Sequence, residues 1–192
     1  VIRSTMKKQL CLTADIGGTN TRVALFDNQK LLESSCVTYS NNEYDSFEAI
    51  IKNYLDFVSE SSVKFAGIAA AGPIQEKSAK MTNLSWNLTE RSIASITGAE
   101  QVGIINDLQA QGYGLTSLDK ADLEPITVGS QSANSNATRL VCGIGTGFNA
   151  APVFNIGHKI FVPPSEAGHS QLSLTDKSYQ PVFEKIGSVG SF

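Results

Sequence analysis

A short segment near the start of the chain combines glycines with polar and charged side chains in a pattern typical of anion-binding loops. Its members are Asp15, Gly17, Gly18, Thr19, Asn20 and Arg22. Two glycines let the backbone turn sharply and bring its N–H groups close to an anion, and the polar side chains can donate to phosphate oxygens. Asp15 could hold Mg²⁺ directly or through water. An ordinary Gly-Gly hairpin explains the same segment, so both interpretations stay open.

A second glycine segment, Gly145, Thr146 and Gly147, repeats this combination of glycines and a hydroxyl. Taken alone, this segment is weak evidence for a phosphate site, because a tight hairpin explains it equally well. A dinucleotide-binding fold would also need a helix directly after the glycines. The second segment supports a phosphate site only in combination with the first. Two glycine-threonine turns are what a cleft between two related domains would use to hold a polyphosphate from both sides.

Asn106 and Asp107 lie where the apolar run 101–105 gives way to helical periodicity. A carboxylate at a junction of strand and helix is held firmly and can face the crevice beyond the strand ends, and Asn106 can fix a ligand hydroxyl. Asp107 could be a general base, or it could only cap the helix. The two roles are compatible with each other.

Glu166 and His169 follow the stiff pair Pro163-Pro164. A solvated loop is the more usual explanation of such a pair, because a metal site would need further ligands. Hydrogen bonding of the two side chains to a polyol is a credible alternative. Asn83 lies among polar residues beside the single tryptophan, Trp86, where an apolar anchor under a loop and a ligand contact are both open.

Composition excludes several classes of partner. The 192 residues are 41% hydrophobic and 17% charged, which is typical of a compact α/β protein. The net charge of −3 gives no reason to expect binding to nucleic acid or to an anionic membrane.

Cys11, Cys36 and Cys142 are far apart in the sequence, and we interpret them as reduced core thiols. No apolar run approaches the roughly 20 residues that span a bilayer, and we expect a cytoplasmic protein.

The elements that must position these side chains can be read from periodicity. We expect a three-strand meander, a helix opened by a capping box of Asp45 and Glu48, a strand, a second helix whose bounds the periodicity does not give, another strand and a further helix. Their ranges are 9–16, 20–27 and 31–39, then 47–58, then 64–71 and 101–105, then 108–118. Because parallel neighbours need a crossover whereas a hairpin needs only a turn, this order predicts a mixed sheet with helices on it.

After a polar loop at 130–138 the chain begins a similar architecture again. We expect strands at 139–145, 149–155 and 159–162, and a short helix capped at Thr175-Asp176 that runs to about residue 186. His158 reads as a surface residue of a turn. The predicted domains are therefore 6–118 and 119–192, the second one unfinished.

Taken together and in this order, these motifs resemble the bacterial glucokinase family, within the actin-like, ribonuclease-H-like sugar kinases. The matching stretches are ADIGGTNTRVAL at 14–25, the Ala-Gly-Pro turn at 71–73, MTNLSW at 81–86, INDLQA at 105–110, GIGTG at 143–147 and SEAGH at 165–169. The resemblance implies an α/β fold: an actin-like ATPase domain with a mixed sheet, followed by an incomplete second domain of the same type. Two residues depart from the family pattern. Asn149 stands where the family favours a small, glycine-like residue, and Ala167 stands where a second glycine usually precedes Gly-His.

The function implied by the resemblance is the glycolytic transfer of the γ-phosphoryl group of ATP to the 6-hydroxyl of glucose, with Mg²⁺. Asp107 would be the base. Sugar hydroxyls would be bound by Asn83, Asn106, Asp107, Glu166 and His169. Both glycine segments and Arg22 would bind ATP, with Asp15 at the metal. A homodimer is compatible with this family. Family members continue well past residue 192, so we expect a fragment with little activity; a kinase for another hexose and a sugar-binding module without catalysis remain alternatives.

Overall fold

The computed structural model describes residues 9–60, 62–75, 77–81, 84–127, 137–144, 148–165, 167–169 and 180–181. The chain divides into two compact units, Val1–Asp107 and Leu108–Phe192, which we call unit 1 and unit 2. The domain boundaries inferred from the sequence, 6–118 and 119–192, stay a prediction. The predicted helix near the C-terminus falls almost entirely outside the described residues.

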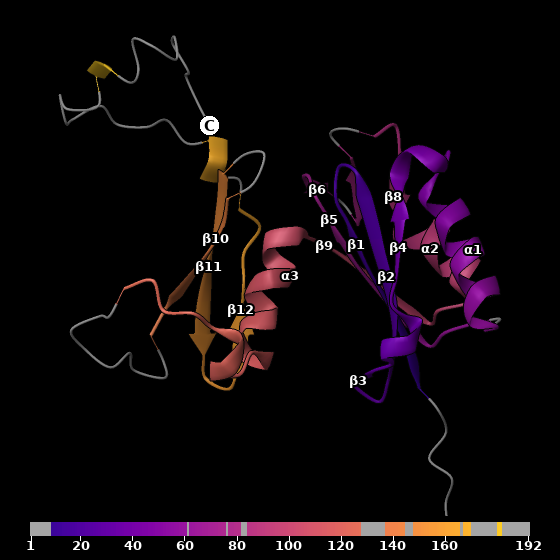
Figure 1. Cartoon of the computed structure of the whole chain (residues 1–192), viewed down its shortest axis with the longest axis horizontal. Helices are drawn as coiled ribbons and strands as arrows, with labels where there is room; N and C mark the ends of the chain where they lie inside the picture. The colour runs from indigo at the N-terminus through magenta and orange to yellow at the C-terminus, as the bar shows by residue number, and fades with distance from the viewer. Residues whose placement is uncertain are drawn as a thin grey trace, which may run out of the picture. The chain divides into compact units, whose positions relative to one another are not determined.

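Unit 1 is built on a six-stranded mixed sheet with the strand order β3-β2-β1-β5-β9 and with β4 also paired to β2 (Figure 1). The strands are β1 Leu10–Ile16, β2 Asn20–Asp27, β3 Lys30–Leu31, β4 Val37–Ser40, β5 Phe65–Ala70 and β9 Gln101–Asn106. Strand β1 is antiparallel to β2 and parallel to β5, and β5 is parallel to β9. The predicted mixed sheet is confirmed.

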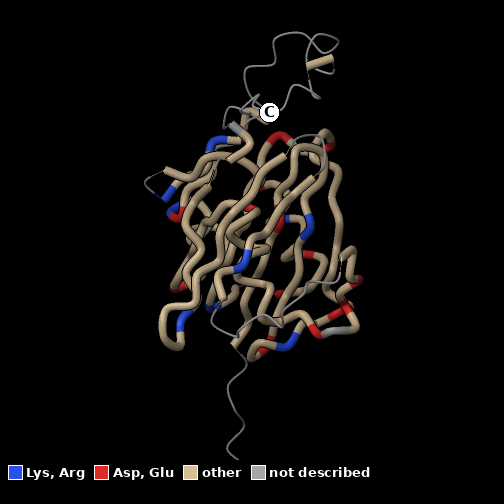
Figure 2. The backbone as a smooth tube through the Cα atoms, turned by 90° about the vertical axis from the view of Figure 1, so that its left-hand side faces the viewer, with Lys and Arg blue, Asp and Glu red and all other residues tan. Residues whose placement is uncertain are grey.

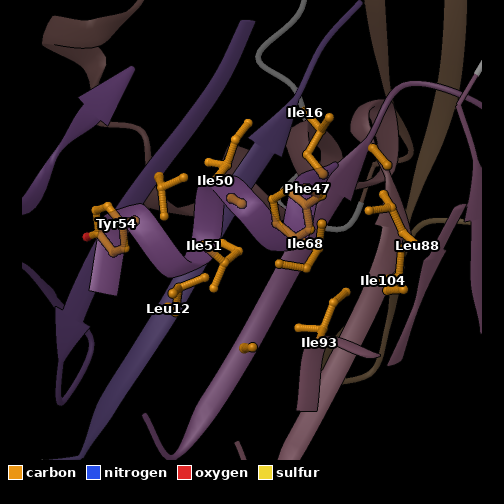
Figure 3. Packing of buried hydrophobic residues seen from close by; sticks show 14 of the residues in the cluster. Leu12, Ile16, Phe47, Ile50, Ile51, Tyr54, Ile68, Leu88, Ile93 and Ile104 are labelled. Atoms are coloured by element: carbon orange, nitrogen blue, oxygen red, sulfur yellow. The ribbon is translucent and has the colours of Figure 1, made fainter. Parts of the chain in front are cut away.

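Two helices, α1 Phe47–Val58 and α2 Glu90–Thr97, pack on one face of this sheet (Figure 1). Alternate residues of β1, beginning with Leu10, point into the core between the sheet and the helices, as strand geometry requires. Figure 3 shows this packing, in which α1 places Phe47 and Ile50 near Ile16 of β1. The largest fully buried side chains of unit 1 are Tyr54, Phe47, Leu12, Ile16, Ile50, Ile51, Ile68, Leu88 and Ile93.

The bounds of α1 match the predicted helix, but the predicted capping box is wrong. Ser46 is the N-cap, and its side chain accepts a hydrogen bond from the backbone N–H of Ala49 at 3.2 Å. Both Ser and Asp are good caps. Ser46 is the cap because the helix begins at Phe47, the first residue of the apolar stripe, which has to be buried.

The third predicted strand, 31–39, is also wrong, because the chain breaks there. Strands β3 and β4 each pair with β2 and are separated by the 3₁₀ turn η1 Glu33–Ser35. The hydroxyl of Ser35 accepts from the backbone N–H of Leu25 at 2.8 Å. The side chain thus satisfies a buried β2 donor that a continuous strand would have paired through its backbone.

A small three-stranded sheet completes unit 1, with β6 Ile74–Gln75, β7 Ser78–Lys80 and β8 Asn87–Thr89. The backbone N–H of Met81 donates to the carbonyl of Trp86 at 3.3 Å. The Trp86 side chain is buried, with Met81 beside it in the same core. The structure therefore favours the apolar anchor for Trp86. Asn83 lies outside the described residues.

Unit 2 contains a three-stranded antiparallel sheet, β10 Arg139–Ile144, β11 Phe148–Ile156 and β12 Lys159–Phe161, in that order. The predicted second meander is confirmed. Helix α3, Asp107–Gly114, packs against it, followed by the 3₁₀ turns η3 Leu115–Ser117 and η4 Lys120–Asp122. The core of unit 2 consists of Leu108, Val141, Ala151, Val153 and Val162. His158 is exposed in the turn between β11 and β12, as predicted.

The cysteines are free thiols, but they do not lie in the core as the sequence analysis predicts. Cys36 and Cys142 are exposed and Cys11 is half-buried. Cys142 follows the buried Val141 on β10, so strand alternation directs it away from the core. Cys36 falls between η1 and β4, where the broken strand leaves it in solvent.

Charged residues of both signs are distributed over the described part of the chain (Figure 2). Among the described helices, none is both long and apolar enough to cross a membrane.

Candidate functional site

The candidate site of unit 1 is the edge of the sheet where three parallel strands end. Ile16 of β1 is in register with Ala70 of β5, and Ala70 is in register with Asn106 of β9. Because the carboxyl ends of parallel strands meet at one edge, residues far apart in the sequence become neighbours there. Asp15 precedes Ile16, and Asp107 follows Asn106 as the first residue of α3.

Asp15, Arg22 and Asp107 form one electrostatic group at this edge. A guanidinium nitrogen of Arg22, Nη1, lies 3.9 Å from Oδ2 of Asp15, on the neighbouring strand. Partial burial raises the pKa of Asp15, the charge of Arg22 lowers it and the charge of Asp107 raises it further. The structure thus brings together two predicted site carboxylates from β1 and α3. The Asp15 side chain remains 56% exposed, so it is open to a ligand.

The first glycine segment forms the tight turn between β1 and β2. The N–H of Gly17 donates to the carbonyl of Asn20 at 2.9 Å. A Cβ at Gly17 would come within 3.3 Å of that same carbonyl oxygen, which is closer than most side chains tolerate. Gly18, Thr19 and Asn20 are exposed. The predicted turn is present, and its polar groups face solvent.

A residue that the sequence analysis missed, Asn41, lies against this turn. It begins the 3₁₀ turn η2, Asn41–Glu43, and is only 2% exposed. Its Nδ2 donates to the carbonyl of Gly17 at 2.9 Å, its backbone N–H donates to the carbonyl of Thr19 at 2.8 Å, and its Oδ1 accepts from Oγ1 of Thr21 at 2.7 Å. The available signal was an Asn-Asn pair directly after a strand, but nothing local indicates which of the two is buried.

Asn106 is buried at the same edge, with 4% of its surface exposed. Its Nδ2 donates to the carbonyl of Gly72 at 3.2 Å, and Ala71 donates its N–H to the carbonyl of Ile16 at 3.0 Å. The turn of Ala71 and Gly72 is therefore tied to both β1 and β9. Gly72 has a φ of 141°, which side-chain-bearing residues rarely adopt.

The predicted site residues of unit 2 are described only in part. Gly145, Thr146, Gly147 and Glu166 lie outside the described residues, and His169 is described only as the end of the 3₁₀ turn η5, Ala167–His169.

Neighbouring residues in unit 2 show how the turn before η5 is attached to β11. Asn149 donates through Nδ2 to the carbonyl of Ser165 at 3.2 Å, and Ser165 donates through Oγ to the carbonyl of Ala150 at 2.5 Å. The N–H of Gly168 also approaches Oδ1 of Asn149, at 3.4 Å. At Asn149, which departs from the family pattern, the side chain takes part in this attachment.

Glucokinases are among the solved structures with a similar fold. A glucokinase from an Antarctic psychrotroph superposes with a TM-score of 0.76 at 29% identity, over 93% of this chain and 56% of that one. The glucokinase of Balamuthia mandrillaris shares the fold, with a TM-score of 0.70 at 21% identity, over 95% of this chain and 55% of that one. The fold of this chain is therefore that of the actin-like sugar kinases.

Sequence comparison identifies the family. The glucokinase family model matches residues 12–188. Curated glucokinases are similar to the chain: that of Nostoc punctiforme is 32% identical over 85% of this chain and 48% of its own length, and that of Tolumonas auensis is 34% identical over 91% and 54%. The chain belongs to the glucokinase family. It spans about half the length of the curated relatives it matches.

Proposed function

We propose that the protein carrying this chain transfers the γ-phosphoryl group of ATP to the 6-hydroxyl of glucose, in the cytoplasm and as a step of glycolysis. Membership of the glucokinase family supports the reaction class. The observation that carries the assignment of roles is the meeting of Asp15, Arg22 and Asp107 at the edge where β1 and β9 end. A glycine turn with exposed polar groups lies next to this group.

Asp107 is the proposed base, which accepts the proton of the 6-hydroxyl. It follows a strand that ends in the buried Asn106, and it starts a helix, so its backbone is held on both sides. Catalysis of phosphoryl transfer rests mainly on positioning and on charge stabilisation, which is what a firmly held carboxylate provides. Asn83, Asn106, Glu166 and His169 are the proposed partners of the other sugar hydroxyls.

The donor set at the edge of β1 fits ATP with Mg²⁺. Mg²⁺ usually takes one or two carboxylates together with substrate phosphates and water, and Asp15 is a half-exposed carboxylate beside a second one. When bound, the ion would neutralise charge on the phosphates. Within the described residues, no group of three or more His, Cys, Asp or Glu could hold a metal ion. Gly17, Gly18, Thr19, Asn20 and Arg22 are the proposed first half of the phosphate site, and Gly145, Thr146 and Gly147 the second.

The test is a coupled ADP-release assay on the full-length protein encoded by the natural gene, with glucose and Mg·ATP. Asp107→Asn should lower kcat by about 10² to 10⁴, the range for loss of a general base. Asn keeps the size of the side chain, so the packing around residue 107 should be preserved. Asp45→Asn, at an exposed aspartate, is the matched control and should leave kcat unchanged.

Three results would change the proposal. Glucose turnover that survives Asp107→Asn would remove the base assignment. Faster turnover of another hexose in a substrate panel would reassign the sugar. Glucose binding by calorimetry without phosphorylation of any hexose would instead indicate a binding module.

A further inference from the structure

Asn41 contacts the β1–β2 turn through three different groups. Its side-chain nitrogen donates to the carbonyl of Gly17, and its backbone N–H donates to the carbonyl of Thr19. Its side-chain oxygen accepts from the hydroxyl of Thr21. Thr21 is fully buried and Asn41 nearly so. Hydrogen bonds that hold a buried amide on both its oxygen and its nitrogen fix the side chain in one orientation.

These contacts also determine where the N–H groups of the turn point. The peptide bonds of the described residues contain no cis bond. In a planar trans peptide, the carbonyl of one residue and the N–H of the next point in opposite directions. The carbonyls of Gly17 and Thr19 point at Asn41, so the N–H groups of Gly18 and Asn20 are directed away from it. Backbone N–H groups of an exposed turn that point to the same side can together bind an anion.

We propose that Asn41 is a positioning residue for phosphate binding: it holds the carbonyls of Gly17 and Thr19 so that the N–H groups of Gly18 and Asn20 are presented to a polyphosphate. The proposal rests on the proposed function for the identity of the anion, which is the phosphate chain of ATP. The contacts lie wholly within unit 1. Asn41 itself would not touch the ligand.

Asn41→Asp is the sharpest variant because it changes one atom. The carboxylate still accepts from Thr21, but an oxygen now faces the Gly17 carbonyl where Nδ2 donated, which replaces a hydrogen bond by repulsion. The matched control is Asn42→Asp. Asn42 is the exposed neighbour whose Oδ1 accepts from Oγ of Ser40 at 2.6 Å, and an aspartate retains that acceptor. Both variants add the same charge one residue apart.

The first measurement is the affinity of the full-length protein for magnesium tripolyphosphate, by calorimetry without sugar. Asn41→Asp should weaken binding about tenfold or more, and Asn42→Asp less than about twofold. In steady-state kinetics the same change should raise KM for ATP by a similar factor and leave KM for glucose within about twofold. A merely structural role would shift the urea midpoint of unfolding without separating the two KM values.

A second pair covers the case in which Asn41→Asp does not fold. Thr21→Val removes the hydroxyl that holds Oδ1 of Asn41, and Thr21→Ser retains it, so only Thr21→Val should weaken tripolyphosphate binding. The proposal is overturned if the parent protein does not bind tripolyphosphate at millimolar concentration, or if Asn41→Asp and Thr21→Val both bind it as the parent does. Tripolyphosphate binding that depends on Asn41 in a protein without hexose kinase activity would leave this proposal standing and remove the proposed function.

Discussion

Gly112 of α3 occupies a position where a side chain does not fit. A Cβ there would lie 2.9 Å from Cγ1 of Val162, 3.0 Å from its Cγ2 and 3.1 Å from Cγ2 of Val153. Both valines are fully buried, so they have little room to give way. In the same helix, a Cβ added at Gly114 would have no atom within 4 Å. The two glycines therefore form a matched pair for the same substitution.

The expected energies follow from two opposing effects. Replacing Gly by Ala within a helix gains up to about 1 kcal/mol from helix propensity, and the gain is smaller at Gly114, which is the last residue of α3. Overpacking at Gly112 costs about 1 to 3 kcal/mol, and Gly114 has no such cost. We expect Gly114→Ala to be neutral or stabilising, and Gly112→Ala to be less stable than Gly114→Ala by about 1 to 3 kcal/mol.

Hydrogen exchange followed by mass spectrometry suits this test because it reports each unit separately. Peptides from α3 and β11 should exchange faster in Gly112→Ala than in Gly114→Ala, and peptides from β1 and α1 of unit 1 provide the internal reference. Val162→Ala in the Gly112→Ala background should recover part of the loss, since it removes the methyl groups that clash. Equal protection of α3 in the two glycine variants would refute the packing argument, as would additive effects of Gly112→Ala and Val162→Ala.

Two further predictions concern titratable groups. The pKa of Asp15 is raised in the folded chain, chiefly by burial. The folded state therefore holds the Asp15 proton more tightly than the unfolded state, and this contribution to stability is present below about pH 4 and is lost as pH rises through the raised pKa. Asp15→Asn should thus gain stability relative to the parent between pH 4 and 7 in urea unfolding, and a constant difference across that range would contradict the assignment. Cys36 and Cys142 are exposed, whereas burial raises the pKa of the half-buried Cys11. Iodoacetamide at pH 8 should therefore label Cys11 last, as read by peptide mass spectrometry, and equal labelling of all three thiols would show that Cys11 is more accessible than it is in the structure.

Local periodicity was sufficient for some of the regular elements, but it gave no range for α2 or for the small sheet of β6, β7 and β8. The bounds of β2 and α1 agree with the ranges expected from the sequence, because alternation and the helical stripe of apolar residues are both local signals. The same signal failed over 31–39. There the hydroxyl of Ser35 bonds to Leu25 across the sheet, and no local pattern encodes that contact.

The sequence by itself determined three features of this protein: the glycine turn between β1 and β2, the residue types of the candidate site and the resemblance to glucokinases. They depend on which side chains occur and in what order.

Only the tertiary structure decided which of these side chains meet. Asp15 and Asp107 interact because β1, β5 and β9 are parallel and in register, so that their carboxyl ends share an edge. Asn41 and not its neighbour Asn42 holds the glycine turn, because the pairing of β4 with β2 places Asn41 beside Thr21 and Gly17. Strand register and burial are set by contacts between residues distant in the chain, and a one-residue shift would exchange the inward and outward side chains.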